Sequence, residues 1–313
     1  MAASVVASAF NVGAYLGRIG IVASASSSAD LSFLTTITNA HSRAIAFENF
    51  DVVLRRPVLM AAHAIEAKLV GNARGDLGDT PAPRRGGYCF EQNTLLMCAL
   101  GALGYFVEPI LCRVRWGKAV GEETPFTHMA LRVRTSDGRV YLADVGFAGL
   151  NSVAPLELTG TAQKLPEGLF RSFQTACGGW TKLQVYMKGD WVDLYMWRSN
   201  EAATSADLAV ANFWSHAAPT ARFTGCFFAS RVVGEDRHHI LNDTYTVRGI
   251  RNKGTNRGTV REEEEEEEEE ATTLTHTRIT GEGHLVQLLS GVFQLDPPMG
   301  LAQEWSKTYA KIA

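Results

Sequence analysis

Cysteine is scarce in this sequence, with five cysteines among 313 residues and no two of them at CxxC spacing. A sparse, odd-numbered set argues against a disulfide framework and against a zinc site, and it favours a reducing compartment. The chain also lacks a long apolar run, and its start lacks a basic segment ahead of an apolar core. We therefore predict no signal peptide, no membrane span and no metal, and we expect a cytoplasmic protein.

Basic clusters are lacking too, which argues against a nucleic-acid-binding surface. The net charge is −3, from 30 basic and 33 acidic residues, and nine consecutive glutamates at positions 262–270 determine its sign. Without those glutamates the charge is +6 (−3 plus 9), which suits a small anionic ligand. Because like charges repel, we expect the acidic insert at 252–271 to be a disordered loop or a frayed helix. The alternative is a tail that binds a basic partner.

The apolar and charged fractions, 46% and 20%, are ordinary for a globular protein with a sizeable core. The first part of the chain shows near-helical apolar spacing, the middle changes to a period of two, and the last third is mixed. An antiparallel sheet or barrel is therefore expected in the middle. The predicted helices lie at 31–40, 57–70, 94–100, 206–214 and 283–293. The predicted strands lie at 105–114, 128–134, 140–145, 183–196, 224–233 and 244–251.

Cys89 lies between a double glycine, Gly86 and Gly87, and a predicted helix. The glycines let the backbone turn sharply, and the start of a helix offers free N–H groups and a positive dipole end to the sulfur. This setting lowers the pKa of a thiol, and the thiolate is the reactive species. The competing interpretation is a small buried apolar residue, as most free cysteines are. The double glycine favours the nucleophile, because an ordinary core helix does not need it.

A cysteine nucleophile needs a base, and the base needs an orienting partner. Among eight histidines, His128 has the best setting, because it begins an alternating segment that would hold the ring on a strand. Asp144 follows on the next strand in an apolar stretch, where an unpaired buried carboxylate would be costly. The competing interpretation is a structural histidine and a turn-capping aspartate.

The hairpin between these strands provides a geometric test. A two-residue turn at Asp137 and Gly138 would make the numbers of paired residues sum to 275, with His128 and Asp144 on opposite faces. A bulge or a three-residue loop gives a sum of 274 and puts Asp144 diagonal to His128 on one face. The triad therefore requires a bulge or an odd-length loop.

Several segments resemble the arylamine N-acetyltransferases. Residues 85–93, RGGYCFEQN, resemble the RGGxCFExN signature of that family, and residues 46–49, AFEN, are similar to its PFEN segment. Residues 127–129, THM, and 144–147, DVGF, look like the histidine and aspartate segments in the family's order. The resemblance runs from about residue 12 to about residue 235 and fades beyond, and the glutamate run is not part of the pattern.

The resemblance implies an α+β fold in three parts. These are a helical bundle with the catalytic cysteine at 1–95, an antiparallel β-barrel with the histidine and aspartate at 96–205, and an α/β lid at 206–313 that holds the acidic insert. It also implies ping-pong transfer, in which acetyl-CoA acylates Cys89 and the acetyl group passes to an arylamine, arylhydrazine or N-hydroxyarylamine. Malonyl-CoA or another acyl-CoA remains possible as the donor. We expect a monomer or a weak homo-oligomer.

The resemblance also carries residue roles. It makes Cys89, His128 and Asp144 the catalytic residues, assigns Phe47, Phe147 and Phe223 to the acceptor pocket and places Thr220 at the CoA site. Lone phenylalanines are otherwise most often core residues. Arg85 and Glu91 are expected to form a structural pair beneath Cys89, supported by Gly86 and Gly87.

Two other functions fit the same residues. A cysteine hydrolase of the peptidase type could use the same triad, because this constellation recurs on unrelated folds. The absence of a secretory signal and of a Cys-Trp motif counts against it, and the two are distinguished by whether water or an aromatic amine consumes the acyl-enzyme. A non-catalytic binding protein on the same fold is disfavoured by the intact set of cysteine, histidine and aspartate.

Overall fold

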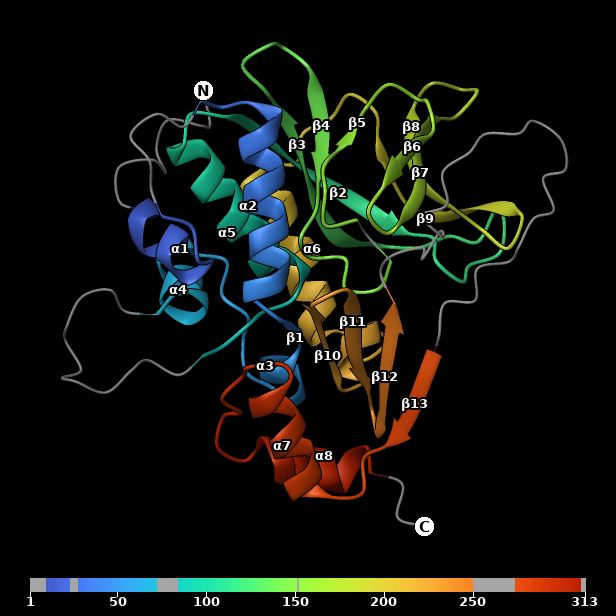
Figure 1. The fold of residues 1–313 in the computed structure, drawn as a ribbon. Helices are drawn as coiled ribbons and strands as arrows, with labels where there is room; N and C mark the ends of the chain where they lie inside the picture. Colours follow the sequence, from blue (N-terminus) through green and yellow to red (C-terminus); the bar gives the residue numbers. More distant parts are fainter. Residues whose placement is uncertain (1–9, 23–27, 72–83, 151, 250–273, 311–313) are drawn as a thin grey trace, which may run out of the picture.

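The computed structural model describes residues 10–22, 28–71, 84–150, 152–249 and 274–310 (Figure 1). The expectation for the acidic insert at 252–271 concerns residues outside these ranges. Helices come first in the chain, two antiparallel sheets follow, and two short helices come last, so the α+β fold class is confirmed. The division of the chain at residues 95 and 205 stays a prediction.

The first part of the chain is helical, as its apolar spacing predicts. The helix predicted at 57–70 begins only at Ala62, because the carbonyl of Val58 accepts a hydrogen bond from the Asn212 side chain (2.9 Å) outside any helix. The helix predicted at 94–100 is the middle of a longer one that begins at Cys89. These helices are α1 (Val12–Arg18), α2 (Leu31–Ala44), α3 (Phe50–Val53), α4 (Ala62–Leu69) and α5 (Cys89–Ala102).

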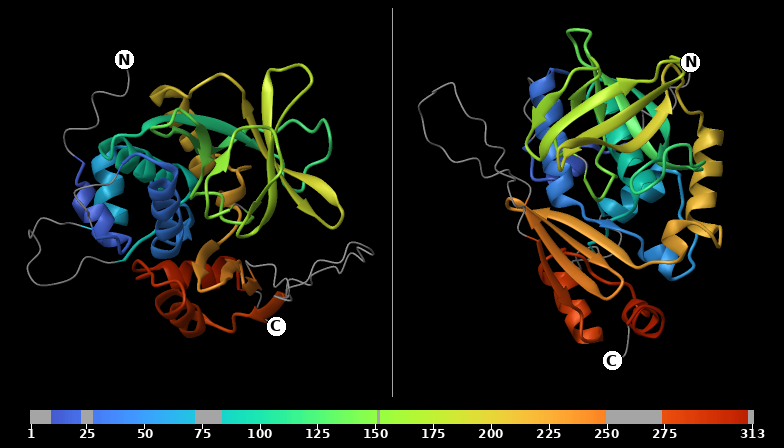
Figure 2. Two further views of the ribbon diagram at one scale, coloured as in Figure 1. Left: turned by 45° about the horizontal axis from the view of Figure 1, so that its top comes forward. Right: turned by 90° about the vertical axis from the view of Figure 1, so that its right-hand side faces the viewer.

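The middle of the chain forms an eight-stranded antiparallel sheet that curls into a nearly closed barrel (Figure 2). The single strand predicted at 183–196 is wrong. Lys188 and Gly189, with φ of 53° and 78°, divide it into a hairpin, because a two-residue turn of this kind needs positive φ at both positions. In chain order the strands are β2 (Phe106–Val114), β3 (Phe126–Arg134), β4 (Val140–Ala143), β5 (Leu156–Glu157), β6 (Gln163–Leu165), β7 (Gly168–Gln174), β8 (Trp180–Met187) and β9 (Asp190–Arg198).

A second sheet of five strands takes its edge strand, β1 (Phe47–Glu48), from the helical part of the chain. Apolar side chains on one face of this sheet, among them Ala229 and Ile240, pack against the two C-terminal helices. The other strands are β10 (Phe228–Val233), β11 (Asp236–Leu241), β12 (Thr244–Gly249) and β13 (Leu274–Arg278). The remaining helices are α6 (Ser205–Ala217), the 3-10 turn η1 (Arg222–Thr224), α7 (Glu282–Gly291) and α8 (Leu301–Thr308).

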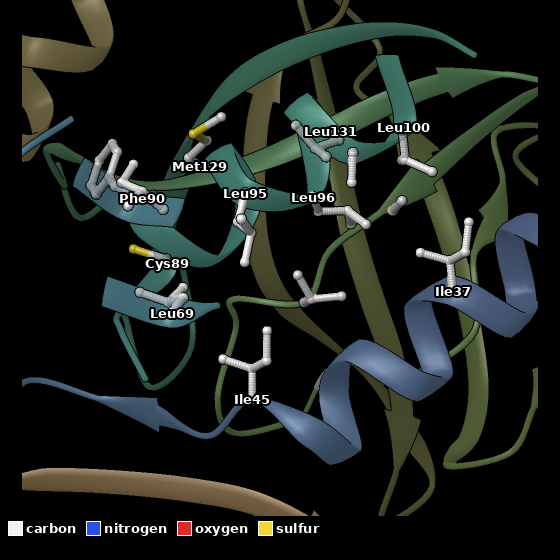
Figure 3. Packing of buried hydrophobic residues seen from close by; sticks show 14 of the residues in the cluster. Ile37, Ile45, Leu69, Cys89, Phe90, Leu95, Leu96, Leu100, Met129 and Leu131 are labelled. Carbon is white, nitrogen blue, oxygen red and sulfur yellow. The ribbon is translucent and has the colours of Figure 1, made fainter. Parts of the chain in front are cut away.

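Strand β3 separates the core of the helical part from the core of the barrel. Met129, Leu131 and Val133 point towards the helices and pack with α5, whereas Ala130 points into the barrel, as the two-residue period of a strand requires. Figure 3 shows Cys89 among the apolar side chains of the helical side, near Leu69, Phe90 and Leu95. The start of α5 is therefore held between the helices and the barrel wall. Within the part of the chain that the structure describes, no helix is long and apolar enough to cross a membrane.

Candidate active site

Helix α5 begins at Cys89, so the sulfur lies at a helix N-terminus as the sequence predicts. The double glycine has a different reason from the expected sharp turn, because neither residue has positive φ. A Cβ atom on Gly86 would lie 2.0 Å from the carbonyl oxygen of Ala46, and one on Gly87 would lie 2.8 Å from Oε2 of Glu91. The two glycines are needed because the backbone of β1 and the Glu91 side chain approach them closely.

The β3–β4 hairpin passes the geometric test set by the sequence. Leu131 pairs with Ala143 and Arg132 pairs with Leu142, so the paired numbers sum to 274. The loop holds Gly138 at φ 86°, and the backbone N–H of Thr135 donates to the carbonyl of Arg139 (3.0 Å). Asp144 therefore follows β4 on the same face as His128, and the prediction of an odd-length loop is confirmed.

His128 and Asp144 form a buried pair. Nε2 of His128 lies 2.7 Å from Oδ2 of Asp144, and the two residues are only 2% and 8% exposed. The Cys89 thiol, 2% exposed, is also a hydrogen-bond partner of His128, and its sulfur lies 3.6 Å from the carbonyl oxygen of Thr127. The structure therefore brings the three predicted catalytic residues together in the order thiol, imidazole, carboxylate.

Five groups hold the Asp144 carboxylate. Oδ1 accepts hydrogen bonds from Asn93 Nδ2 (2.9 Å) and from the backbone N–H groups of Gly146 (2.8 Å) and Phe147 (3.2 Å). Oδ2 accepts from His128 and from the hydroxyl of Tyr195 (2.9 Å). Because both oxygens are fixed, the side of the carboxylate that faces the histidine is fixed as well.

The charges of the pair reinforce each other. Burial lowers the pKa of His128, but the charge of the Asp144 carboxylate and the hydrogen bonds of His128 with Asp144 and Cys89 outweigh it and raise this pKa to about 10. Burial raises the pKa of Asp144, and the charge of His128 with the hydrogen bonds from His128 and Asn93 outweighs it, so the net shift is downward. At neutral pH the arrangement favours an imidazolium beside a carboxylate, and that cation can stabilise a thiolate on Cys89.

Gly146 shows how closely the aspartate loop lies against the start of α5. A Cβ atom at this position would lie 2.7 Å from Cα of Cys89 and 2.6 Å from Nδ2 of Asn93. Any side chain here would displace the cysteine from the pair. The glycine of the DVGF segment therefore sets the distance between the barrel and the helix.

A cluster of five charged side chains lies beneath the double glycine, and it corrects one expectation. Arg85 does not pair with Glu91. It binds Glu48 (2.8 Å) and Asp51 (3.1 Å), whereas Glu91 binds Lys68 (2.7 Å). Lys68 also binds Asp51 (2.6 Å), which links the two halves. Glu91 was expected to pair locally, but its second oxygen accepts from the backbone N–H of Tyr88 (3.1 Å) and turns the carboxylate towards α4.

Replacing Lys68 tests this cluster. We expect Lys68→Met to lower the free energy of unfolding by about 3 to 5 kcal/mol, because it leaves Glu91 and Asp51 buried without their shared cation. Urea unfolding of the variant and the parent measures the difference. Lys307→Met on the exposed face of α8 is the matched control and should change the stability by less than about 0.5 kcal/mol. A loss no larger than that of the control would show that the cluster does not stabilise the start of α5.

The three predicted acceptor phenylalanines fall into two groups. Phe47 and Phe223 contact each other, with ring centroids 5.5 Å apart, and Phe223 also contacts Tyr88 (6.0 Å). Phe147 instead packs against the catalytic side chains, 5.2 Å from the ring of His128. Thr220 is exposed in the turn between α6 and η1, and the hydrogen bonds of the triad described above do not involve it.

Two residues of the site were missed. Asn93 stands in the cysteine motif, but its role is visible only once α5 places it against β4, where it also accepts from the backbone N–H of Val145 (3.1 Å). Tyr195 lies in a strand about fifty residues beyond the aspartate, and its pairing depends on the closure of the barrel, which no local pattern reveals. Its ring is 4.9 Å from that of His128.

Comparison with known proteins agrees with this geometry. A family model described as N-acetyltransferase matches residues 30–280. The arylamine N-acetyltransferase of Mycolicibacterium smegmatis is 36% identical over 237 residues, which cover 74% of this chain and 80% of that protein. The chain belongs to the arylamine N-acetyltransferase family. It is therefore an acetyltransferase, and the resemblance carried by the cysteine motif is confirmed.

Solved structures of this family share the fold. The M. smegmatis arylamine N-acetyltransferase superposes with a TM-score of 0.80 at 28% identity, over 97% of this chain and all of that one. An arylamine N-acetyltransferase of Mycobacterium marinum, solved in complex with CoA, superposes with a TM-score of 0.79 at 26% identity, over 96% of this chain and all of that one. The match includes the C-terminal part of the chain, where the sequence resemblance fades.

Proposed function

We propose that this protein transfers an acetyl group from acetyl-CoA to an arylamine, arylhydrazine or N-hydroxyarylamine through a thioester on Cys89. The observation that carries the proposal is the buried contact of Cys89, His128 and Asp144 at the start of α5. Family membership supports the reaction class. The residue roles rest on the geometry.

The first half-reaction starts from the ion pair that forms when the Cys89 thiol gives its proton to His128. The thiolate attacks the carbonyl carbon of the thioester, and backbone N–H groups at the start of α5 are placed to bind the oxyanion. The carbon–sulfur bond to CoA then breaks, and His128 returns its proton to the CoA sulfur. The product is an acetyl thioester on Cys89, nearly equal in energy to the thioester that it replaces.

In the second half-reaction an un-ionised amine attacks the acetyl carbon. His128 accepts a proton from the amine nitrogen as the carbon–sulfur bond to Cys89 breaks, and the imidazolium again stabilises the thiolate. Asp144 holds the ring and balances its charge in both halves. The amide is the product, and the enzyme returns to its starting state.

The acceptor site is proposed at the aromatic groups beside the triad. Phe147 lies against the ring of His128. Phe223, half-buried and backed by the buried ring of Phe47, offers apolar surface close to Tyr88, the residue just before Cys89. Flat aromatic amines suit such walls. The sequence assigns these phenylalanines to one pocket. We propose that they form two parts of it, one beside the base His128 and one beside the nucleophile Cys89.

For the donor we propose the polar face of the five-stranded sheet, opposite the face covered by α7 and α8. Strand register puts Arg237, His239 and Arg248 on this face, and the charge of Arg237 acts on Asp144. CoA carries several phosphate charges, which cationic side chains attract. The placement of Thr220 at the CoA site remains a proposal that rests on the resemblance alone.

Arg248 offers a test of the donor site. We expect Arg248→Gln to raise the KM for acetyl-CoA several-fold without changing the KM for the amine, and added salt should shrink the difference from the parent. The exposed Arg56 supplies the control variant Arg56→Gln, which should leave both constants unchanged. Equal KM values for acetyl-CoA in parent and Arg248→Gln would remove this face from the donor site.

The reaction itself is tested by intact mass. Mixing the protein with acetyl-CoA should add one acetyl group, and an aromatic amine should then remove it and appear as the acetylated amine. If water removes the group as fast as the amine does, the cysteine hydrolase is the better description. Malonyl-CoA and other acyl-CoAs in the same assay identify the preferred donor.

The setting of the enzyme follows from the same proposal. All five cysteines are free, which suits a reducing compartment, and we propose the cytoplasm. Small aromatic amines or hydrazines are the proposed partners, with no role for nucleic acid or a membrane. Among the described residues no group of three or more potential metal ligands occurs, and the mechanism uses none. A monomer or weak homo-oligomer remains the expectation.

A further inference from the structure

A cavity opens at the end of the barrel away from the triad. It has a volume of about 550 Å³, and its lining includes Phe106, Glu108, Arg132, Arg134, Thr181 and Trp197. We call it the barrel mouth. His128 and Arg134 lie six residues apart along β3, roughly 20 Å at about 3.3 Å per residue, so the two sites are separate.

The barrel mouth is a continuation of the barrel core. The core side chains of β2 and β3 are even-numbered, for example Ile110 and Ala130, and the same alternation brings Glu108 and Arg132 inward one step further along each strand. In the middle of the barrel these inward positions, such as Ile110 and Ala130, are apolar and packed. At the mouth they become polar and leave a cavity of the size that binds small molecules.

The charges of the lining favour an anion. Its charged members are Glu108, Arg132 and Arg134, which sum to +1 (two minus one). Arg132 already has hydrogen-bond partners, because its guanidinium donates to Glu108 (3.0 Å) and to the carbonyl of Ser199 (2.9 Å). Arg134 is held only against the ring of Phe106 (5.7 Å), and among the described residues no carboxylate pairs with it.

Two further residues of the lining carry hydrogen-bond donors. Trp197 is 1% exposed, and its indole N–H has no hydrogen-bond partner among the residues that the structure describes. The buried hydroxyl of Ser172 accepts from the backbone N–H of Gly160 (3.3 Å), which leaves its own proton to donate. Both residues line the cavity, where they can donate to a ligand.

We propose that the barrel mouth binds a small organic carboxylate with an aromatic or apolar body. The carboxylate would receive a charge-assisted hydrogen bond from Arg134, and the body would pack between Phe106 and Trp197. This binding site is distinct from the proposed acceptor and donor sites. It does not depend on the reaction at Cys89.

The test uses 2-naphthoate as the probe and the full-length protein labelled with 5-fluorotryptophan. The fluorine resonance of Trp197, assigned with the variant Trp197→Phe, should shift and saturate as 2-naphthoate is added. The uncharged 2-naphthamide should bind at least about ten-fold more weakly, because it cannot form the charge-assisted bond. This comparison uses the parent protein and is independent of the folding of any variant.

Two variants test where 2-naphthoate binds. Arg134→Gln should weaken binding of 2-naphthoate at least about ten-fold, and Arg139→Gln, at an exposed arginine in the loop of the same hairpin, should leave it within about two-fold. The proposal is overturned if the Trp197 resonance never shifts, or if Arg134→Gln binds 2-naphthoate as the parent does. It is also overturned if Phe223→Ala, at the proposed acceptor site, abolishes the shift of Trp197.

Discussion

Cys89→Ser is expected to lower acyl transfer from acetyl-CoA to an aromatic amine by at least about 10⁴-fold. The reason lies in the charge state of the base. The pKa of His128 is raised to about 10, so at neutral pH the ring is an imidazolium, which stabilises a thiolate but cannot take up a further proton. A serine hydroxyl is far harder to ionise and would need a neutral base to take its proton. Steady-state rates and the mass of the acylated intermediate both measure the loss.

The same helix provides the matched control. Cys98 lies nine residues further along α5 and is also buried, but burial raises the pKa of its thiol to about 11 and no histidine contacts it among the described residues. Cys98→Ser should retain activity within a few-fold. Peptide mapping should find the acetyl label on Cys89 alone. A label on Cys98, Cys112, Cys177 or Cys226, or near-normal turnover by Cys89→Ser, would remove Cys89 from its role.

The sequence could predict the site because its parts are local. Cys89 stands in one motif, and His128 and Asp144 stand on two adjacent strands whose loop length fixes their shared face. Tyr195 could not be predicted in this way, because it reaches Asp144 only when β9 closes the barrel beside β2. Contacts made through sheet closure leave no spacing signal in the chain.

The partners in the charged cluster beneath the double glycine also could not be predicted from the sequence. The sequence resemblance predicts that Arg85 and Glu91 pair with each other, whereas in the structure each takes a different partner. Those partners, Glu48 and Lys68, come from β1 and α4, and their positions depend on how α4 packs beside α5. Pairing between distant ionic residues is decided by packing, which residue spacing does not encode.

Helices and strands also differ in how well the sequence predicts them. Long periodic segments such as α2 and β3 follow the predicted ranges closely, since each has a regular apolar face. Short edge strands such as β1 and β5, two residues each, have no period to read. The strand predicted at 183–196 joins β8 and β9 because the first residue of the turn between them, Lys188, adopts positive φ although it is not a glycine.

Asp144→Asn should lower acylation of Cys89 by about 10³- to 10⁴-fold, more than the loss of one charge suggests. Three N–H donors, from Asn93, Gly146 and Phe147, surround Oδ1, so the amide oxygen of the variant must stay on that side. The amide NH₂ is then turned towards Nε2 of His128. It donates to that nitrogen and moves the ring proton to Nδ1, the nitrogen left to face the thiol, so the ring can no longer accept the thiol proton.

Two further measurements distinguish this account from simple misfolding. Without the carboxylate, burial dominates, and the pKa of His128, followed by NMR, should fall well below about 10.

The stability of the fold should also change with pH in a defined direction. The raised pKa of His128 stabilises the fold fully below its ordinary value of 6.5 and loses this effect towards about 10, while the lowered pKa of Asp144 acts above its ordinary value of 3.8. The stability difference between parent and variant should therefore be largest between these two ordinary values and shrink towards alkaline pH. Asp137→Asn, an exposed carboxylate in the same hairpin, should show neither effect. An Asp144→Asn variant that folds, keeps the high pKa of His128 and turns over normally would remove Asp144 from the triad.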